Sequence, residues 1–282
     1  MYLMNTIVHL KNMIRYLLLF AFVMSSASQM FSQSLTTGYS NLVVKYEVEF
    51  LIDSSDVTSK KNELMTLLIG DHISVYKSDV KASRDSLVRS ITKNAVDGAR
   101  ANNSNNMVVD FSKIPRVNLQ HEVLYKDDKM LVYDKVFRHV FAYEPLHKVN
   151  WSLSKESKMI GKYLCYKAIG FYGQRKFVAW YTPEVPIPEG PYTFKGLPGL
   201  IVALNDFSNT YVFRLVDLKK EKREITQMKN AVNTTFEKFA QARQDSKDNA
   251  VNQVQSVLHR SMSDAEKDLV KRNVNRPTNY LD

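Results

Sequence analysis

Apolar and polar residues alternate with a period of two along most of the chain, which is the pattern of strands with one buried face. Lysine and glutamate separate the first four of the apolar positions Val44, Tyr46, Val48, Phe50 and Ile52. This stretch predicts a half-buried strand, and several similar stretches follow it.

Strands that flank short polar turns predict hairpins. The expected pairs are 64–69 with 72–76, 121–125 with 130–133, 163–171 with 176–181, and 200–204 with 210–218, and the alternation also continues over 135–143. Since few helices separate these strands, we expect a mainly β fold. The predicted architecture is a curved antiparallel sheet or a sandwich-like half-barrel.

One segment in the middle of the chain has a different period. Over 80–99 the apolar residues recur at spacings of three and four with charges between them, which predicts an inserted amphipathic helix. The asparagine-rich stretch 102–106 has nothing to bury and predicts a loop.

The chain becomes polar and helical near its C-terminus, and we expect a helical tail over 231–282. Val251, Val254 and Leu258 share one helical face. The run 263–266, Ser-Asp-Ala-Glu, is typical of a capping box that starts a final helix. Two roles stay open for this tail: a helix laid against the sheet, or a basic contact for a partner or a membrane surface.

The first 32 residues resemble a secretory signal. Lys11 and Arg15 precede the apolar run 16–24, and small residues follow it, with cleavage expected after Ala27 or Ser32. We therefore expect three parts: a signal peptide over 1–32, a β-rich domain over 33–230, and the tail over 231–282. No later apolar run is long enough to span a membrane, so a soluble product is predicted after cleavage.

The composition of the chain limits the covalent links, partners and metal sites that can be expected. Cys165 is the only cysteine, which excludes an internal disulfide and a lipid anchor on a mature N-terminal cysteine. The net charge is +10, but basic and acidic residues are mixed along the chain, so we expect a solvated surface and no nucleic-acid partner. His121, His139 and His147 lack a compact metal-ligand spacing, and neither a metal nor a cofactor is expected.

Two glycines surround a proline at 196–199, Gly-Leu-Pro-Gly. Proline suits position i+1 of a type II turn and glycine suits position i+2, where φ is positive. We expect Pro198 and Gly199 to form such a turn and to start the strand at Leu200.

This segment also carries a family resemblance. The signature GLPGLI of the GLPGLI family is spelled by Gly196, Leu197, Pro198, Gly199, Leu200 and Ile201. The similarity extends upstream through Trp151, Ile160, Gly161, Tyr163, Cys165, Lys167, Ala168, Gly173, Arg175, Ala179, Trp180, Tyr181, Thr182, Ile187, Pro188, Gly190 and Pro191. The resemblance covers most of the chain to about residue 218, whereas the end, 275–282, departs from the family pattern. It implies an exported protein of a Gram-negative bacterium, in the periplasm or at the cell surface, with a structural motif and no assigned activity.

Candidate catalytic groups are few. Cys165 could act as a nucleophile with a histidine as its base, although a cysteine inside an alternating strand is ordinarily a small buried side chain. Glu184 and Glu189 could serve glycoside hydrolysis if the fold placed them on either side of a sugar. Their other interpretation is as exposed loop charges. A hydrolase that uses Cys165 or this carboxylate pair is therefore the alternative function.

Aromatic residues suggest a binding site instead. Trp151, Arg175, Trp180 and Tyr181 could line an open cleft for a carbohydrate or an apolar ligand, or the rings could simply fill the core. The function expected from the sequence is an exported binding or accessory module, with an envelope protein or a carbohydrate as its partner.

Overall fold

A computed structural model of the chain describes residues 36–53, 55–101, 114–115, 117–228, 230–274 and 281. The predicted signal peptide and the predicted loop 102–106 lie outside these residues. The strands are β1 (Thr36–Tyr39), β2 (Leu42–Leu51), β3 (Lys60–Gly70), β4 (Ile73–Ser78), β5 (Glu122–Lys126), β6 (Lys129–Val136), β7 (His139–Tyr143), β8 (Asn150–Ile160), β9 (Tyr163–Tyr172), β10 (Arg175–Thr182), β11 (Leu200–Asp206), β12 (Tyr211–Lys220), β13 (Glu224–Thr226) and β14 (Ala231–Asn233). The helices are the short 3-10 helix η2 (Val57–Ser59), α2 (Asp79–Ala101), α3 (Phe236–Asp248), α4 (Ala250–Leu258) and α5 (Asp264–Val274).

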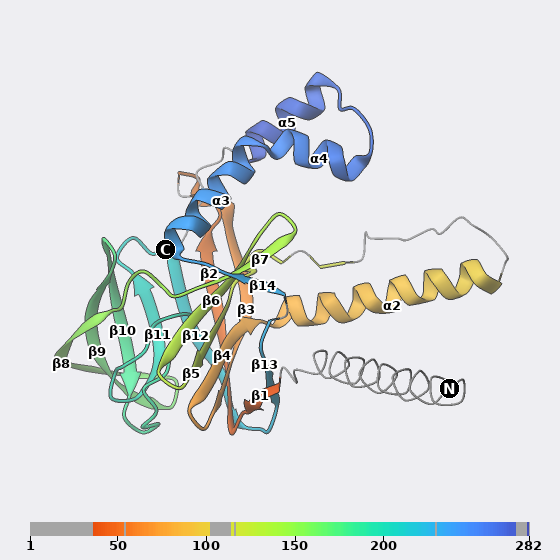
Figure 1. The fold of residues 1–282 in the computed structure, drawn as a ribbon. Helices are drawn as coiled ribbons and strands as arrows, with labels where there is room; N and C mark the ends of the chain where they lie inside the picture. The colour runs from red at the N-terminus through yellow and green to blue at the C-terminus, as the bar shows by residue number, and fades with distance from the viewer. Residues whose placement is uncertain are drawn as a thin grey trace, which may run out of the picture.

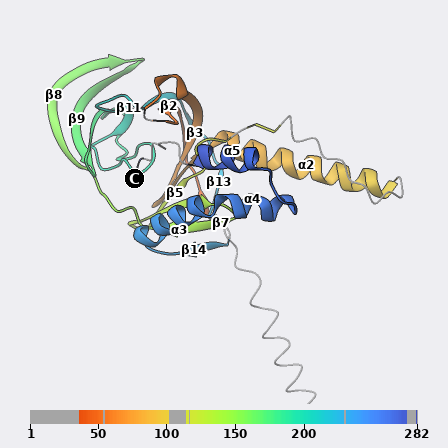
Figure 2. The same cartoon turned by 90° about the horizontal axis from the view of Figure 1, so that it is seen from above.

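Twelve strands form one sheet in the order β14-β7-β6-β5-β4-β3-β2-β12-β11-β10-β9-β8. Every neighbouring pair is antiparallel except β14 and β7, which are parallel. β1 and β13 form a separate two-stranded sheet. The large sheet is curved and does not close into a barrel (Figures 1 and 2). The prediction of a mainly β fold with a curved antiparallel sheet is confirmed.

The main core lies on the inner face of this curve, and both halves of the sheet contribute to it. Val44, Tyr46 and Val48 of β2 belong to the same buried cluster as Phe177 of β10 and Leu204 of β11. The Tyr46 hydroxyl donates a hydrogen bond of 2.7 Å to the carbonyl of Ile201, a β11 residue that is not on a neighbouring strand. The alternation read from the sequence therefore marks the face that the curved sheet encloses.

The predicted hairpins are present, and turn residues explain their geometry. Asp127 and Asp128 both have positive φ, 49° and 64°, as a two-residue type I′ turn requires. The stretch 135–143 was expected to continue as one alternating segment, but a turn at Phe137, with φ 52°, divides it between β6 and β7. Phe137 is apolar, so composition gave no turn signal there.

Four strands were not predicted. β8 is long, but it is an edge strand with most of its side chains exposed, so no buried alternation marks it. β1, β13 and β14 have only three or four residues each. β14 covers the first three residues of the predicted helical tail, and the helices begin only at Phe236.

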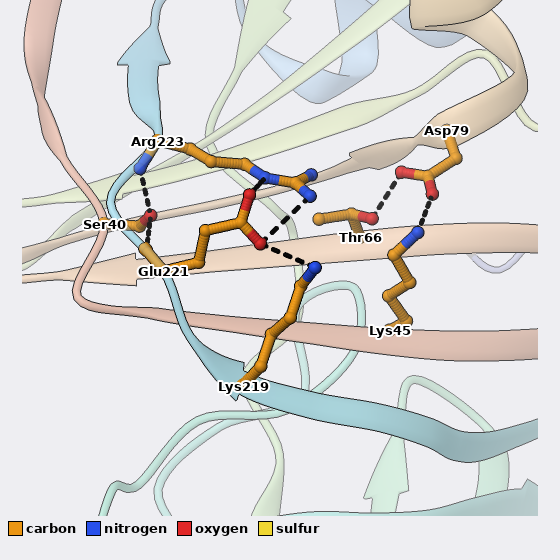
Figure 3. A network of polar contacts seen from close by, with 7 residues as sticks. All are labelled: Ser40, Lys45, Thr66, Asp79, Lys219, Glu221 and Arg223. Carbon is orange, nitrogen blue, oxygen red and sulfur yellow. Dashed lines mark hydrogen bonds and ion pairs between the residues drawn. The ribbon is translucent and has the colours of Figure 1, made fainter.

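The predicted inserted helix is α2, and its N-terminal end is tied to the sheet by a polar network (Figure 3). The Asp79 carboxylate accepts a hydrogen bond from Thr66 and pairs with Lys45 Nζ at 2.9 Å. Thr66 and Lys45 are cross-strand partners on β3 and β2. An acidic residue is also favourable at a helix N-terminus. Beyond this anchor, α2 extends past the sheet (Figure 1).

A second part of this network joins the connection between β12 and β13 to Ser40, which lies just before β2. Glu221 pairs with Lys219 Nζ at 2.7 Å and with Arg223 Nε at 2.6 Å. The Ser40 hydroxyl donates to the Glu221 carbonyl and accepts from the Arg223 amide (Figure 3). These bonds hold the connection from β12 to β13 against the start of β2.

The described part of the tail forms α3, α4 and α5, of which α3 packs on the sheet. Phe239 stacks on Tyr143 of β7, with ring centroids 4.5 Å apart, and Phe236 contacts the same tyrosine. The predicted capping box is present: the Glu266 amide donates to Ser263 Oγ, and the Ser263 amide donates to the Glu266 carboxylate. None of the helices in the described part of the chain is long and apolar enough to cross a membrane.

The turn at Pro198 and Gly199 differs from the predicted type II turn. The Gly199 amide donates to the Leu197 carbonyl at 2.7 Å, which makes a three-residue turn centred on Pro198. The amide of Leu200 donates to Val185 instead of closing a four-residue turn. Glycine is required here because a Cβ on residue 199, at φ 151°, would lie 2.2 Å from the Thr182 carbonyl oxygen. β11 does start at Leu200, as expected.

We predict that Gly199→Ala destabilises the protein by roughly 2–4 kcal/mol, because the new methyl group must push the Thr182 carbonyl away. Denaturant unfolding with an unchanged slope would measure this loss. Gly98→Ala is the control, since a Cβ at this helical position meets nothing within 4 Å. It should be neutral or stabilise by up to ~1 kcal/mol. A Gly199→Ala protein as stable as its parent would show that the close approach is not needed.

Candidate functional site

The segment 183–199 connects β10 to β11 and fills the inside of the curved sheet. Phe194 is fully buried, and its ring lies 4.6 Å from the ring of Phe177 and 6.1 Å from that of Phe213, measured between centroids. Main-chain hydrogen bonds also fix the segment, from the Gly196 amide to Pro188 and from the Ile201 amide to Glu189. In the motif, Leu197, Leu200 and Ile201 are buried.

A cavity of about 440 Å³ lies where this segment meets the β5–β6 turn and the chain before β8. We call it the Lys195 cavity. Its lining consists of Tyr125, Asp128, Lys129, Met130, Glu144, Pro145, His147, Lys148, Val149, Pro188, Glu189, Thr193, Lys195 and Gly196. Its volume is in the range of small-molecule sites.

A buried ion pair forms the polar centre of the cavity. Lys195 Nζ lies 2.7 Å from the Glu189 carboxylate, and the two side chains are only 15% and 10% exposed. The same ammonium donates to Ser74 Oγ at 3.1 Å and lies 3.4 Å from the centre of the Tyr125 ring. The Lys195 ammonium therefore has two polar partners and one aromatic ring in contact with it.

Burial shifts both groups of the pair toward their neutral forms. Burial raises the pKa of Glu189, and the neighbouring Lys195 ammonium opposes part of that rise. Burial lowers the pKa of Lys195, and Glu189 opposes that change in turn. The 2.7 Å contact and the Ser74 hydroxyl stabilise the charged pair, which we take as the form present at neutral pH.

Thr193 lies between these two residues in the sequence and also lines the cavity. It is 8% exposed, and its hydroxyl has no hydrogen-bond partner within the described part of the chain. A buried hydroxyl without a partner is costly, so such groups in native proteins call for an explanation. A ligand that hydrogen-bonds to Thr193 would provide one.

The structure divides the four residues of the predicted cleft between two faces. Tyr181 belongs to the main core, and Trp151 packs against it, with the indole N–H donating to the Lys195 carbonyl at 2.9 Å. Arg175 lies over the Tyr211 ring. Trp180 precedes Tyr181 on β10, so its side chain points to the opposite face, where Lys158 Nζ lies 4.0 Å from the centre of its ring. Trp151, Trp180 and Tyr181 are absent from the lining of the Lys195 cavity.

The candidate catalytic groups make contacts that do not suit the predicted chemistry. Cys165 is fully buried, and burial raises the pKa of its thiol to about 11, which disfavours the reactive thiolate. The Glu184 carboxylate accepts a hydrogen bond from the Leu164 amide, whereas Glu189 pairs with Lys195. These contacts give the proposed hydrolase no support.

A second cavity, of about 500 Å³, lies on another part of the inner face. We call it the His121 cavity. It is lined by Phe50, Leu51, Ile52, Asn118, Leu119, Gln120, His121, Asp134, Lys135, Phe137, Tyr192, Tyr211 and Leu281. Burial, with a smaller effect from Lys81, lowers the pKa of His121 from 6.5 to about 4. The imidazole is therefore neutral at neutral pH.

Sequence reasoning named Glu189 but missed Thr193 and Lys195. A signal for them was present, because Glu189 and Lys195 flank the aromatic stretch Pro-Tyr-Thr-Phe at 191–194. Opposite charges on the two sides of a short apolar segment are consistent with an ion pair that is buried together with that segment.

Comparisons with known proteins match part of this site. A family model described as a protein of unknown function (Porph_ging) matches residues 171–203, which include Glu189, Thr193, Lys195 and the GLPGLI motif. No curated protein matches this chain. The solved structures of PNGF-II in the P21 and C2 space groups are similar, each with a TM-score of 0.46 at 12% identity over 75% of this chain and 34% of that chain. The chain thus spans about a third of the length of PNGF-II, and this weak likeness carries no argument about function.

Breaking the ion pair should be costly. We predict that Lys195→Met destabilises the protein by roughly 3–5 kcal/mol, because it leaves the Glu189 carboxylate buried without its partner. Adding Glu189→Gln should recover most of this loss, as denaturant unfolding would measure. Lys267→Met is the control, since it breaks an exposed pair with Asp264 and should leave the stability almost unchanged. If the double variant is as unstable as Lys195→Met alone, the buried charge is not the cause.

His121 should make the stability depend on pH. Because its pKa is lower in the folded than in the unfolded protein, the unfolded chain binds the extra proton between pH 6.5 and 4. The stability that depends on neutral His121 is fully present above pH 6.5. As the pH falls toward 4, the free energy of unfolding decreases by about 1–3 kcal/mol. Urea unfolding of the parent and of His121→Gln across this range would measure it. Parallel curves for the two proteins would contradict the prediction.

Proposed function

We propose that this chain is an exported GLPGLI-family protein that acts as a periplasmic or envelope-associated binding module. We further propose that the Lys195 cavity binds a neutral, polyhydroxylated ligand, of which a carbohydrate is the obvious class. The observation that carries this proposal is Thr193, which lines the cavity and whose buried hydroxyl has no hydrogen-bond partner among the residues that the structure describes.

The charges of the cavity favour a neutral ligand. Three acidic residues, Asp128, Glu144 and Glu189, and three lysines, Lys129, Lys148 and Lys195, line it, so their formal charges cancel. The Lys195 ammonium already pairs with Glu189, donates to Ser74 and lies over the Tyr125 ring, so a second anionic group would compete with Glu189 for it. A neutral ligand avoids the cost of placing another charge beside this pair.

The remaining lining suits a molecule with both polar and apolar faces. Met130, Pro145, Val149 and Pro188 provide apolar surface, which can pack on the C–H face of a sugar ring. The Glu189 carboxylate has lone pairs beyond those used by Lys195, and the Thr193 hydroxyl can donate and accept. These groups match the hydroxyls of a sugar.

Export and family membership rest on the sequence. The signal-like residues 1–32 and the ordered match to the GLPGLI pattern support them, and the family model that matches 171–203 covers the same motif. Binding and not catalysis is favoured because the Cys165 thiol is buried and because Glu184 and Glu189 have separate partners.

The test is ligand binding to the chain recovered from an osmotic-shock fraction of cells, where export would place it. We predict that neutral envelope oligosaccharides raise its thermal midpoint, whereas anionic polymers do not. Thr193→Val should weaken binding about 2- to 10-fold, as calorimetry would measure, because it removes one hydrogen bond at constant shape.

Thr226→Val is the matched control, since Thr226 is exposed on β13 and does not line the cavity. It should leave the affinity unchanged. Binding of anionic polymers alone, or equal affinities of the parent and Thr193→Val, would contradict the proposal.

A further inference from the structure

The segment 118–121 forms one wall of the His121 cavity, and a buried carboxylate fixes its main chain. Glu63 of β3 is only 4% exposed, and its carboxylate accepts hydrogen bonds from the amides of Asn118 and Leu119 at 2.9 and 3.1 Å. The Ser78 hydroxyl donates to the same carboxylate. These three donors stabilise a charge that would otherwise be costly to bury. The wall is therefore held in place without a ligand, which lowers the cost of binding one.

Ring contacts, and not hydrogen bonds, hold the His121 imidazole in this wall. Its ring lies nearly parallel to that of Tyr76, with centroids 6.3 Å apart and an interplanar angle of 16°. It meets the Tyr192 ring edge to face, with centroids 4.9 Å apart. None of the hydrogen bonds in the described part of the chain involves its two nitrogens. Since a neutral imidazole has one donor and one acceptor nitrogen, His121 can offer both to a ligand.

Aromatic rings form much of the cavity lining around His121. Phe50 of β2 and Tyr211 of β12 stack with their ring centroids 6.0 Å apart and an interplanar angle of 14°. Phe137 and Tyr192 line the cavity as well. Aromatic rings pack favourably on one another in offset or edge-to-face arrangements. The lining therefore favours a flat aromatic ligand.

The charges around the cavity favour an uncharged ligand. The lining includes one acidic and one basic residue, Asp134 and Lys135, whose formal charges cancel. Lys81 of α2 is close enough to lower the pKa of His121, but its ammonium pairs with the Glu122 carboxylate at 2.8 Å. A lining without net charge does not compensate a charged ligand for the water that it loses on binding.

We propose that the His121 cavity is a second ligand site, which takes a small uncharged aromatic molecule with a hydrogen-bonding group that pairs with the imidazole. The rings of the lining pack on the aromatic part of the ligand. The cavity volume of about 500 Å³ is sufficient for such a molecule. The proposal does not depend on the carbohydrate site, because the two cavities share no lining residue.

Indole is the probe that tests this site, because it is flat, uncharged and carries one N–H group. We expect saturable binding of indole to the full chain at neutral pH in a calorimetric titration. Indene has a similar shape without the N–H group and should bind about 2- to 10-fold more weakly. The anion indole-3-carboxylate should also bind more weakly than indole. No saturable binding of indole, or equal binding of the three compounds, overturns the proposal.

A substitution at His121 tests the hydrogen bond to the ligand. His121→Phe keeps a planar ring without the ring nitrogens, so it should weaken indole binding about 2- to 10-fold and leave indene binding unchanged. His139→Phe is the matched control, since His139 is exposed on β7 and does not line the cavity. It should change neither affinity. An undiminished preference for indole in folded His121→Phe would show that the imidazole does not bind the ligand.

A second pair of variants locates the probe without changing His121. Ile52 lines the cavity, and Ile52→Trp should fill part of it and weaken indole binding at least about tenfold. Leu269→Trp, on the exposed face of α5, is the control and should have no effect. Thermal unfolding confirms that both variants are folded, and unchanged binding in folded Ile52→Trp contradicts the proposed site.

The Thr193→Val variant distinguishes this proposal from the carbohydrate site. Thr193 does not line the His121 cavity, so the variant should bind indole as tightly as the parent. Weaker indole binding by Thr193→Val would place the probe in the Lys195 cavity and overturn the proposal of a second site. Loss of carbohydrate binding alone would leave the indole result intact, so the two proposals fail separately.

Discussion

The side chain of Phe194 occupies the place where the two halves of the curved sheet meet, and the fold depends on it. A sheet that curves without closing has an inner face that must be covered. Helix α3 covers it at β7, where Phe239 stacks on Tyr143. The connection 183–199 covers it where Phe194 is buried. Phe194 touches aromatic residues of four different strands, Trp151, Tyr172, Phe177 and Phe213, and is fully buried among them.

The same connection carries charge into the interior. Glu189 and Lys195 lie on either side of the aromatic stretch that fills the core, so both enter with it. Burying either charge without its partner would be energetically costly. The 2.7 Å contact between the two side chains, the Ser74 hydroxyl and the Tyr125 ring together stabilise the buried pair. The pair lies in the same cavity lining as Thr193, whose hydroxyl has no hydrogen-bond partner within the described residues. The proposed binding site rests on this combination of groups.

The sequence predicted the elements whose side chains alternate against a core, and it failed where local pattern carries no such information. The alternation at Tyr46 and the turn at Asp127 were readable because burial and turn chemistry act on neighbouring residues. β8 was not readable, because an edge strand with exposed faces has no apolar period. The sequence also could not show which residues of the predicted cleft face inward. Trp180 and Tyr181 are adjacent on a strand and point to opposite faces, and only the curvature of the sheet decides which of these faces is enclosed.

The backbone conformation of Tyr192 determines how the connection 183–199 contributes to the two cavities. Tyr192 has a φ of 54°, a left-handed conformation that costs a non-glycine residue about 1–2 kcal/mol. Its side chain lines the His121 cavity, whereas the next residue, Thr193, lines the Lys195 cavity. Tyr192 also contacts His121 and Tyr172, which hold the ring in place on one side of the segment. The strained residue therefore aims two successive side chains at two separate cavities, and the packing of the sheet around segment 183–199 supplies the energy that maintains it.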